Sequence, residues 1–561
     1  MRNRRLVVSV AAIAAGVGLI PGVAQADPAK PDARGASTPD LDLGLGKAAE
    51  SKIKGHTFTS PAERTVRKAL PSAKTGASGA PSAQSAADNP NLAVELNGYG
   101  MTAHSIELQS ILTSANTSLE VSIAWGDGKT DVVSAYGSQT VTNSHTYAEV
   151  GAYTVKVTVK DVTNGVSAVN ELAIVTPGSD FTPYTPTRLL DTRFGTGVTQ
   201  GKVGPGASTR VKVGGNGKIP AGVTAVVLNV TVTNTTDSGF ITAFPEGSER
   251  PTTSNVNHKA GQTVPNLVIV PVGKNGYVEL SNRGWQSVDL IADVTGYFTH
   301  TASSGYTPVD PTRFVDTREG LGTAKRKLGG QSTFATQISG LRGVPQGITA
   351  VALNVTVTNP QGAGHLTVYP TSGSIPTTSN LNFNAGQTIA NSVIVPVSAD
   401  GKISVFNGAW SPTDVVVDVV GYYSKDSQSA FLPLTPERVF DTREPSDPVY
   451  GPLWGDSYIY LPISHSNRSI TGWVFNSTVT NTNGSGYLTV TPDPNSRDDY
   501  INGSEIWPTP PNSSNLNWTK GDTVPNLVQA STGNNGIIDF WNRGWDDIDL
   551  VVDLFGLYQK G

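Results

Sequence analysis

The chain has 561 residues, of which 37% are hydrophobic and 15% are charged. This length exceeds what one hydrophobic core organises, so several domains are expected. The formal net charge of −5 argues against nucleic acid or an anionic membrane as partner, because both require a basic surface. The absence of cysteine excludes disulfides, thiolate metal sites and cysteine nucleophiles.

The first 26 residues have the pattern of a secretory signal peptide. Arg2, Arg4 and Arg5 precede an apolar run over 6–20, and "VAQA" ends at Ala26, the expected cleavage position. The Arg4-Arg5 pair leaves twin-arginine export as an alternative. No later segment approaches 18 apolar residues, so no membrane span is expected. We therefore expect a secreted protein, either extracellular or non-covalently associated with the cell wall.

Residues 27–93 are rich in Ala, Ser, Pro, Gly and Lys and poor in aromatic residues. Such a composition buries too little apolar surface to offset chain entropy, which predicts a disordered linker or pro-segment. A short helix over 61–70 is an alternative within it.

Residues 94–177 show alternating apolar and polar residues with turn signals every 8–12 residues, the pattern of a small β-sandwich. The run Trp125-Gly126-Asp127-Gly128 is followed by His145-Thr146-Tyr147 and then by "TVKVTVKD". These two motifs resemble the PKD domain family. The resemblance implies an immunoglobulin-like sandwich in which both motifs are structural, and a role as a spacer or contact module of secreted proteins.

From residue 178 onward the sequence consists of three repeats of one unit, the repeat modules 178–300, 301–425 and 426–561. The hexapeptides "RLLDTR", "RFVDTR" and "RVFDTR" place an aspartate at 191, 316 and 441, so the repeat length is 125 residues. This period matches a whole domain rather than a solenoid turn. Each unit also carries a "SNxN" motif and a Gly-x-Thr-x-x-Asn motif. The repeats resemble tandem modules of secreted actinobacterial proteins, which implies a location rather than an activity.

The long strand of the repeat separates two faces. In the first module Val226, Leu228, Val230 and Val232 share one face, and Asn229 and Thr231 lie on the other. The apolar face requires a second sheet, so each unit is predicted to be an independently folded, jelly-roll-like β-sandwich. The fold class is accordingly all-β, with an N-terminal immunoglobulin-like sandwich and three tandem sandwiches. Ser477 replaces Val230 in the third module, where Trp473 and Phe475 are expected to supply the missing bulk.

The last strand of each unit is apolar on both faces, which predicts a central strand, yet it carries two aspartates. A buried carboxylate requires a cation or several donors, and the opening hexapeptide supplies two arginines. Both arginines are expected to pair with these aspartates, while the hexapeptide's own aspartate closes its turn through backbone N–H groups. The residues of these structural ion pairs are Arg188, Asp191, Arg193 and Asp293; Arg313, Asp316, Arg318 and Asp418; and Arg438, Asp441, Arg443 and Asp553.

Two chemical alternatives exist for these residues. Asp191, Asn255 and Asn257 could together supply calcium ligands, although no Ca²⁺-loop motif is present. The paired aspartates of the last strand stand about 13 Å apart, beyond the roughly 5–9.5 Å of glycosidase carboxylates. No cofactor is therefore expected apart from this calcium alternative. No metal-spaced histidine pair, nucleophile elbow or phosphate loop occurs, so the chain is not expected to be an enzyme.

Tryptophan gives the most direct indication of function. Trp285, Trp410 and Trp545 fall at the same hairpin tip of each module, where an exposed indole suits stacking on a sugar ring. The alternative is that each indole folds back as a lid over its own sandwich. Six of the nine tryptophans belong to the third module, which also carries an inserted segment, so this module is favoured if only one binds. The candidate ligand-binding residues are Trp285, Trp410, Trp545, Arg283, Arg543, Asn282 and Asn542.

The sequence thus predicts a secreted non-catalytic protein that binds cell-wall or environmental polysaccharide through tandem contacts. The alternative hypothesis is a structural or protein–protein scaffold with a cell-surface protein as partner. The third hypothesis is an extracellular hydrolase.

Overall fold

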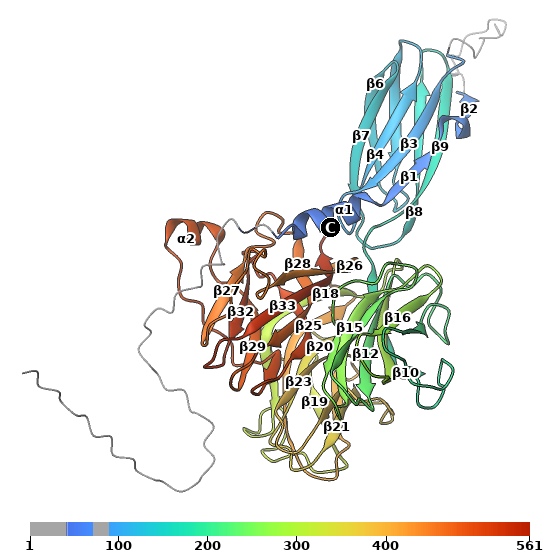
Figure 1. The fold of residues 1–561 in the computed structure, drawn as a ribbon. Coiled ribbons are helices and arrows are strands. Elements are labelled where there is room, and N and C mark those ends of the chain that lie inside the picture. Colours follow the sequence, from blue (N-terminus) through green and yellow to red (C-terminus); the bar gives the residue numbers. More distant parts are fainter. Residues whose placement is uncertain (1–40, 42, 71–88) are drawn as a thin grey trace, which may run out of the picture. The chain divides into compact units, whose positions relative to one another are not determined.

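The computed structural model describes residue 41 and residues 43–70 and 89–561, and the regular secondary structure of these residues is almost entirely β-strand (Figure 1). The predicted signal peptide, residues 1–26, lies outside the described residues. Gly, Pro, Asn and Thr recur between the strands and provide the turns. The predicted all-β class is confirmed.

The N-terminal sandwich has two antiparallel sheets, in the strand orders β1-β3-β4-β7 and β2-β9-β8-β5-β6. Trp125 lies in its core, stacked on His145 with ring centroids 4.7 Å apart, and donates to Asp131. Both sequence motifs of this region therefore hold the sandwich together. Its strands are β1 (Thr57–Ser60), β2 (Val66–Ala69), β3 (Ala93–Gly100), β4 (Ser105–Thr113), β5 (Ser118–Ala124), β6 (Thr130–Tyr136), β7 (Gln139–Thr146), β8 (Ala152–Asp161) and β9 (Val166–Val175).

The prediction of a disordered linker over 27–93 is wrong for its described part. Helix α1 (Leu45–Lys54) buries Leu45, Ala49 and Ile53, whose spacing of four residues places them on one helical face. After it, β1 and β2 add edge strands to the two sheets of the N-terminal sandwich, and a 3₁₀ turn (Ala62–Arg64) joins them. Three spaced apolar residues suffice here because neighbouring domains supply the surface that they cover.

Each repeat module is an eight-stranded sandwich of two four-stranded antiparallel sheets. Module 1 contains β10 (Asp180–Asp191), β11 (Ser208–Lys212), β12 (Ala225–Thr233), β13 (Gly239–Pro245), β14 (Val256–His258), β15 (Val264–Pro271), β16 (Tyr277–Asn282) and β17 (Asp289–Thr299). Module 2 contains β18 (Gly305–Asp316), β19 (Ser332–Gln337), β20 (Ala350–Thr358), β21 (Gly364–Pro370), β22 (Leu381–Phe383), β23 (Ile389–Pro396), β24 (Lys402–Asn407) and β25 (Asp414–Ser424). Module 3 contains β26 (Ala430–Asp441), β27 (Ser457–Leu461), β28 (Ile470–Thr480), β29 (Gly486–Pro492), α2 (Arg497–Asn502), β30 (Leu516–Trp518), β31 (Val524–Ser531), β32 (Ile538–Asn542) and β33 (Asp549–Gln559).

The strand order identifies each module as a jelly roll. In module 1 the sheets run β10-β17-β12-β15 and β11-β16-β13-β14, and modules 2 and 3 repeat this order. First pairs with eighth strand, second with seventh, third with sixth and fourth with fifth, as in two nested Greek keys. The eighth strand lies between the first and third strands, as its apolar sequence on both faces predicted.

The two faces of β12 are buried for different reasons. Val226, Leu228, Val230 and Val232 pack into the core of their own module. On the opposite face Asn229 and Thr231 are only 1% and 2% exposed. A sheet of a lone sandwich would present such polar residues to water, so something else covers this face.

The cover is the other two modules, and the expectation of independently folded sandwiches is wrong. One cluster of buried side chains draws from all three modules. Phe181 and Phe298 of module 1 lie against Tyr423 of module 2 and Phe431 of module 3, with ring centroids 4.2 to 6.4 Å apart. Apolar residues on the outer face of the first sheet of each module thus create a second core between the modules.

A ring of asparagines repeats the same contact around this shared core. Each link donates from a side-chain nitrogen in one module to a side-chain oxygen in another, and all six residues are buried. The three links are Asn391 to Asn229 at 3.2 Å, Asn526 to Asn354 at 3.2 Å, and Asn266 to Asn476 at 2.9 Å. Module 2 therefore contacts module 1 as module 3 contacts module 2 and as module 1 contacts module 3, which closes the set with threefold pseudosymmetry.

The first strands of the modules close a second ring. The backbone of Phe181 bonds to Ser304, that of Tyr306 to Ser429, and that of Phe431 to Ser179, each over 2.9 Å. Since the second ring joins the modules in the same cyclic order, equivalent points of the three modules lie at the same height along the pseudo-threefold axis. The three copies of any surface loop therefore lie at the same height along this axis and at the same distance from it.

Candidate functional site

The repeated hexapeptide builds an ion cluster at the end of each first strand. Arg188 donates to both oxygens of Asp293 at 2.9 and 3.2 Å, and also to Asp191 at 3.1 Å. Asp191 accepts the backbone N–H of Arg193, which closes the turn. The guanidinium of Arg193 binds Asp191 at 2.7 and 2.9 Å rather than the predicted Asp289 or Asp293, because both residues belong to one tight turn.

The same cluster recurs in modules 2 and 3. Arg313 and Arg438 pair with Asp418 and Asp553 at 2.9 and 2.8 Å. The other pairs are Arg318 with Asp316 and Arg443 with Asp441, each at 2.6 Å. All six aspartates are almost fully buried. The cluster is therefore a buried structural lock between the first and last strands.

The electrostatics of the two aspartates differ. Burial raises the pKa of Asp293 above its ordinary value, against the opposing hydrogen bond and charge of Arg188. For Asp191 burial also acts to raise the pKa, but the hydrogen bonds from Arg193 and the charges of both arginines outweigh it and lower the pKa. The second aspartate of the last strand, Asp289, accepts from Thr192 and Asn234.

The calcium alternative does not fit these residues. The oxygens of Asp191 face two guanidinium groups, so a cation there would meet two positive charges. Asn255 uses its side-chain oxygen to accept the backbone N–H of Ala243. Among the described residues no group of three or more His, Cys, Asp or Glu side chains could hold a metal ion.

The three predicted indoles project from the surface, and the lid alternative is wrong. Trp285, Trp410 and Trp545 are 82%, 89% and 85% exposed, the largest exposed fractions among the exposed large hydrophobic residues of the described chain. They occupy the same turn before the last strand of each module. By the threefold pseudosymmetry, they lie at the same height along the axis of the three-module assembly and at the same distance from it.

Asn282 and Asn542 do not flank a ligand but hold the tip from beneath. Asn282 is fully buried. It donates to the carbonyls of Val203, Gly204 and Gln286 and accepts from Gly284. Asn542 makes the corresponding bonds in module 3. Asparagine is needed here because its amide satisfies several backbone groups of one loop at once.

The two candidate arginines differ from each other. Arg283 is exposed beside Trp285, whereas Arg543 pairs with Asp456. Module 2 has Gly408 at this position. The arginine is therefore not a repeated part of the tip, and only the indole is.

Sequence reasoning did not single out two further exposed aromatic residues in the loops beside these tips. Phe194 follows the hexapeptide of module 1 and is 73% exposed, with the guanidinium of Arg193 over its ring at 5.0 Å. Tyr450 of module 3 is 56% exposed. Both belong to the loop after the first strand, which runs beside the tryptophan turn through the bridges Val203–Val288 and Leu453–Ile548. An aromatic residue in an otherwise polar turn was the available signal.

The inserted segment of module 3 covers an aromatic patch on its second sheet. Tyr458, Tyr460 and Trp541 replace Ser208, Arg210 and Ser281 of module 1, and Tyr500 and Trp507 of the insertion pack against them. Most tryptophans of module 3 are therefore packing residues. Beneath them Asp539 is fully buried near Asp493, and burial followed by the negative charge of Asp493 raises its pKa well above the ordinary value.

Two cavities lie at the boundaries between modules. The smaller, of about 610 Å³, is lined by Lys52 of α1, by His56 just after this helix, by His300 of module 1 and by Pro433 of module 3. Burial, then the charges of His300 and Lys52, lower the pKa of His56 to about 4. The larger, of about 1270 Å³, separates modules 2 and 3.

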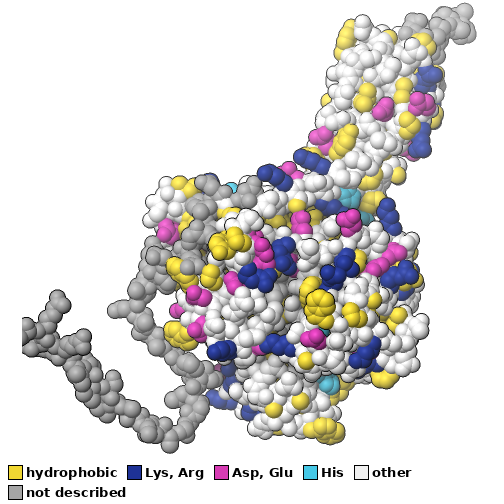
Figure 2. Space-filling model, viewed as in Figure 1, with side chains coloured by type: hydrophobic (Ala, Val, Ile, Leu, Met, Phe, Trp, Pro, Cys, Tyr) yellow, Lys and Arg dark blue, Asp and Glu magenta, His cyan; other side chains and the backbone are white. Residues whose placement is uncertain are grey.

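The visible surface of the protein carries charges of both signs (Figure 2). Figure 2 shows Lys and Arg interspersed with Asp and Glu on the visible face, among many uncharged side chains. No helix within the described residues is long and apolar enough to cross a membrane.

No protein-family model and no curated protein matches the chain. Among solved structures, a SusE-like protein is similar at 11% identity and a TM-score of 0.12, over 36% of this chain and 96% of its own. The tandem CBM22 domains of Xyn10C from Paenibacillus barcinonensis reach 12% and 0.15, over 42% and 98%. A triple jelly roll protein of an archaeal virus reaches 12% and 0.15, over 68% and 90%. TM-scores this low carry no argument about function.

Proposed function

We propose that the chain is a secreted, non-catalytic protein that binds polysaccharide of a cell wall or of the environment through its three indole tips. The observation that carries this proposal is the repeated exposure of Trp285, Trp410 and Trp545, each above 80%. The contact of an exposed indole with water is unfavourable, so burying the ring against a ligand gains free energy, and a flat apolar ring stacks well on the C–H face of a sugar.

The threefold arrangement of the tips supports a multivalent mode of binding. A polysaccharide surface presents many equivalent sugars, so three weak contacts on one rigid body act together and gain avidity. The buried asparagine beneath each tip supports a pre-organised contact, because it fixes the turn before any ligand arrives. In this proposal the N-terminal sandwich, which resembles PKD domains, is a spacer.

The test is a pull-down of the full chain on insoluble glycans and on purified cell walls. The variant Trp285→Ala/Trp410→Ala/Trp545→Ala is expected to lose binding by roughly 10²-fold or more, and each single variant by much less. Tyr136→Ala is the matched control, because Tyr136 is an exposed aromatic residue (62%) of the N-terminal sandwich.

Two results would contradict the proposal. Undiminished binding of the triple variant would remove the indole tips as the contact and favour a scaffold that meets a protein partner. New reducing ends after prolonged incubation with soluble glycans would contradict the non-catalytic assignment.

A further inference from the structure

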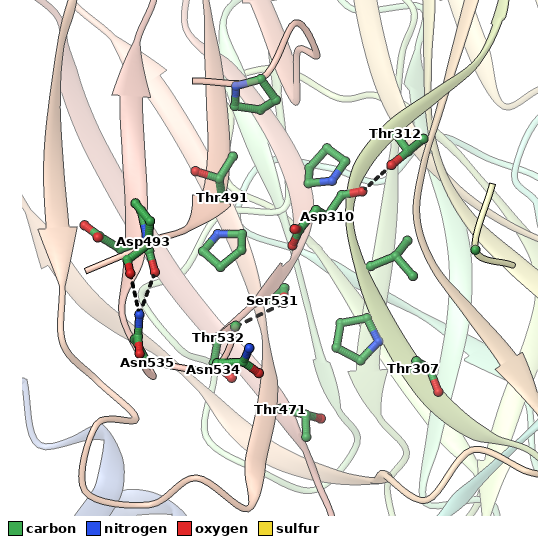
Figure 3. A pocket seen from close by; sticks show the side chains of 18 of the residues that line it. Thr307, Asp310, Thr312, Thr471, Thr491, Asp493, Ser531, Thr532, Asn534 and Asn535 are labelled. Atoms are coloured by element: carbon green, nitrogen blue, oxygen red, sulfur yellow. Dashed lines mark hydrogen bonds between the residues drawn. The ribbon is translucent and has the colours of Figure 1, made fainter. Parts of the chain in front are cut away.

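The larger cavity is an open cleft between the first strand of module 2 and the strand ends of module 3. Figure 3 shows Thr307, Asp310 and Thr312 of β18 on one side, with Thr491 and Asn534 among the residues on the other. Its volume of about 1270 Å³ exceeds the roughly 300–1,000 Å³ that suits a drug-sized ligand. The cleft thus has room for several units of a chain molecule.

The inserted segment of module 3 builds one wall of this cleft. It connects β29 to β30 over residues 493–515, where modules 1 and 2 use only 246–255 and 371–380. Helix α2 inside it is fixed by a reciprocal pair of bonds between Ser496 and Asp499. Because the insertion is unique to module 3, the pseudo-equivalent boundaries of the other modules cannot form the same wall.

Trp507 is the aromatic residue of that wall. Its ring meets Tyr458 edge-on at 4.9 Å and Trp541 at 5.8 Å, so the indole is held by packing on one side. It nevertheless lines the cleft and stays half-buried, next to Ile506, which is 65% exposed. A rigid, partly exposed indole beside an exposed aliphatic residue forms a stacking platform with little entropy left to lose on binding.

The charges of the cleft balance. Its acidic side chains are Asp310, Asp426 and Asp493, and its basic ones are Arg342, Arg468 and Lys560. Two of the cations already bind backbone carbonyls, Arg342 that of Arg313 and Arg468 that of Asn534. A balanced field with engaged guanidiniums offers no net attraction to an ion and favours an uncharged ligand.

The hydroxyl groups of the cleft are oriented in advance. Thr307 shares a hydrogen bond with Ser427 over 2.7 Å, and Thr312 donates to the carbonyl of Asp310 over 2.8 Å. Thr471 donates to Ser429 over 2.9 Å. Each of these oxygens retains acceptor capacity, since a hydroxyl has two lone pairs. Fixed hydroxyls beside an indole match a ligand that is itself rich in hydroxyls.

We propose that this cleft is a second ligand site, which takes a single uncharged glycan chain of several sugar units along the boundary of modules 2 and 3. The proposal shares the ligand class of the proposed function but none of its residues. The tips would hold a surface of many chains, whereas the cleft would hold one chain lengthwise with Trp507 as its platform.

The test is isothermal titration calorimetry of the full chain with cellohexaose, xylohexaose and chitohexaose. At least one is expected to bind, and Trp507→Ala to weaken it by roughly tenfold or more. Trp507→Phe, which keeps a ring against Tyr458, is expected to retain most of the affinity. Near-ultraviolet circular dichroism reports whether the packing of module 3 survives in each variant.

A blocking variant keeps the test decisive if Trp507→Ala fails to fold. Asn534 is an exposed cleft residue, and Ala399 is exposed at the equivalent position of module 2. Asn534→Arg is expected to abolish hexasaccharide binding, and Ala399→Arg to leave it unchanged. Equal effects of the two variants on hexasaccharide binding would contradict the proposal that the cleft is a ligand site.

The two sites are separable by crossing the assays. The triple tip variant is expected to bind the hexasaccharide as well as the unaltered chain, while it no longer sediments with insoluble glycan. If the unaltered chain sediments with glycan but binds none of the three hexasaccharides, the proposed cleft site is contradicted and the proposed binding by the indole tips is not. Loss of hexasaccharide binding in the triple tip variant would also contradict the proposal that the cleft binds the hexasaccharide.

Discussion

Asn391 of module 2 donates a hydrogen bond to the side-chain oxygen of Asn229 of module 1 over 3.2 Å, although 162 residues separate them. The side-chain oxygen of Asn391 in turn accepts the backbone N–H of Leu267 at 3.3 Å. One amide therefore satisfies groups of the neighbouring module with both of its ends. This arrangement, made three times, joins three jelly rolls into one body.

Replacing Asn391 by Ala should destabilise the contact between modules. The change leaves the buried N–H of Leu267 and the oxygen of Asn229 each short of a partner, at a cost of about 1–3 kcal/mol for each orphaned group. Urea unfolding measures the loss. Asn384→Ala, at an exposed position of module 2, is the control, and an equal effect of both changes would contradict a role of the ring in stability.

Replacing Arg188 by Ala should cost more than the loss of any surface ion pair. Asp293, whose side chain is 1% exposed, would be left buried without its guanidinium, and such a loss costs about 3–5 kcal/mol. Arg210→Ala removes an exposed partner of Glu246 and should cost less than about 1 kcal/mol. Comparable midpoints of urea unfolding for the two variants would show that the Arg188 pair is not structural.

The buried Asp539 should make module 3 sensitive to rising pH. Burial and the charge of Asp493 raise its pKa in the folded state, so the folded state holds the proton more tightly than the unfolded state does. The stability from this proton is complete below the ordinary pKa and is lost as the pH rises through the folded-state value. The other groups that face it are Asp493, Tyr458 and Tyr500.

Asp539→Asn is therefore expected to raise the melting temperature at pH 7 and to change it little near pH 4. Asp498→Asn, at an exposed position of α2, is the control and should shift neither. A melting temperature of Asp539→Asn that tracks that of the unaltered chain across this range would contradict the assignment.

Ser477 is a defect in the core of module 3. Its hydroxyl is buried with no hydrogen-bond partner among the described residues, while modules 1 and 2 carry Val230 and Val355 there. Ser477→Ala removes the unsatisfied group without adding volume, so stability should hold or rise by about 1 kcal/mol. Ser464→Ala is the contrasting change, since the Ser464 hydroxyl accepts from Trp473 at 2.8 Å, and it should destabilise. Destabilisation by Ser477→Ala would mean that the hydroxyl has a partner.

The architecture of a single module could be predicted because its cause is local. The alternation of Val226, Leu228 and Val230 requires an inner sheet, and the apolar last strand requires a central place. The arrangement of modules around an axis could not, because Asn229 has the same polar signature whether it meets water or another module. The repeated Gly-x-Thr-x-x-Asn motif carried the signal, because it places an asparagine at the same position of all three modules, at 266, 391 and 526.

The site was predicted in part for a similar reason. The place of Trp285 in a turn followed from the sequence, whereas an exposed indole and an indole folded back as a lid were both compatible with that place. A polar residue next to an exposed ring can either contact the ligand or support the turn. The sequence favours the first role for Asn282, whereas the structure shows the second, since its amide donates to three carbonyls. The cleft depends on the contact between β18 and module 3, which cannot be inferred from the spacing of residues in the sequence.

The central claim is that residues 178–561 form one cooperative body around a shared core, because this is what holds the three indoles in one threefold arrangement. Hydrogen exchange of the full chain at increasing urea, resolved for peptides from β15, β23 and β31, tests it most directly. The account predicts that all three strands lose protection at the same urea concentration. Three separate midpoints, with one module exchanging fully while the others remain protected, would contradict it.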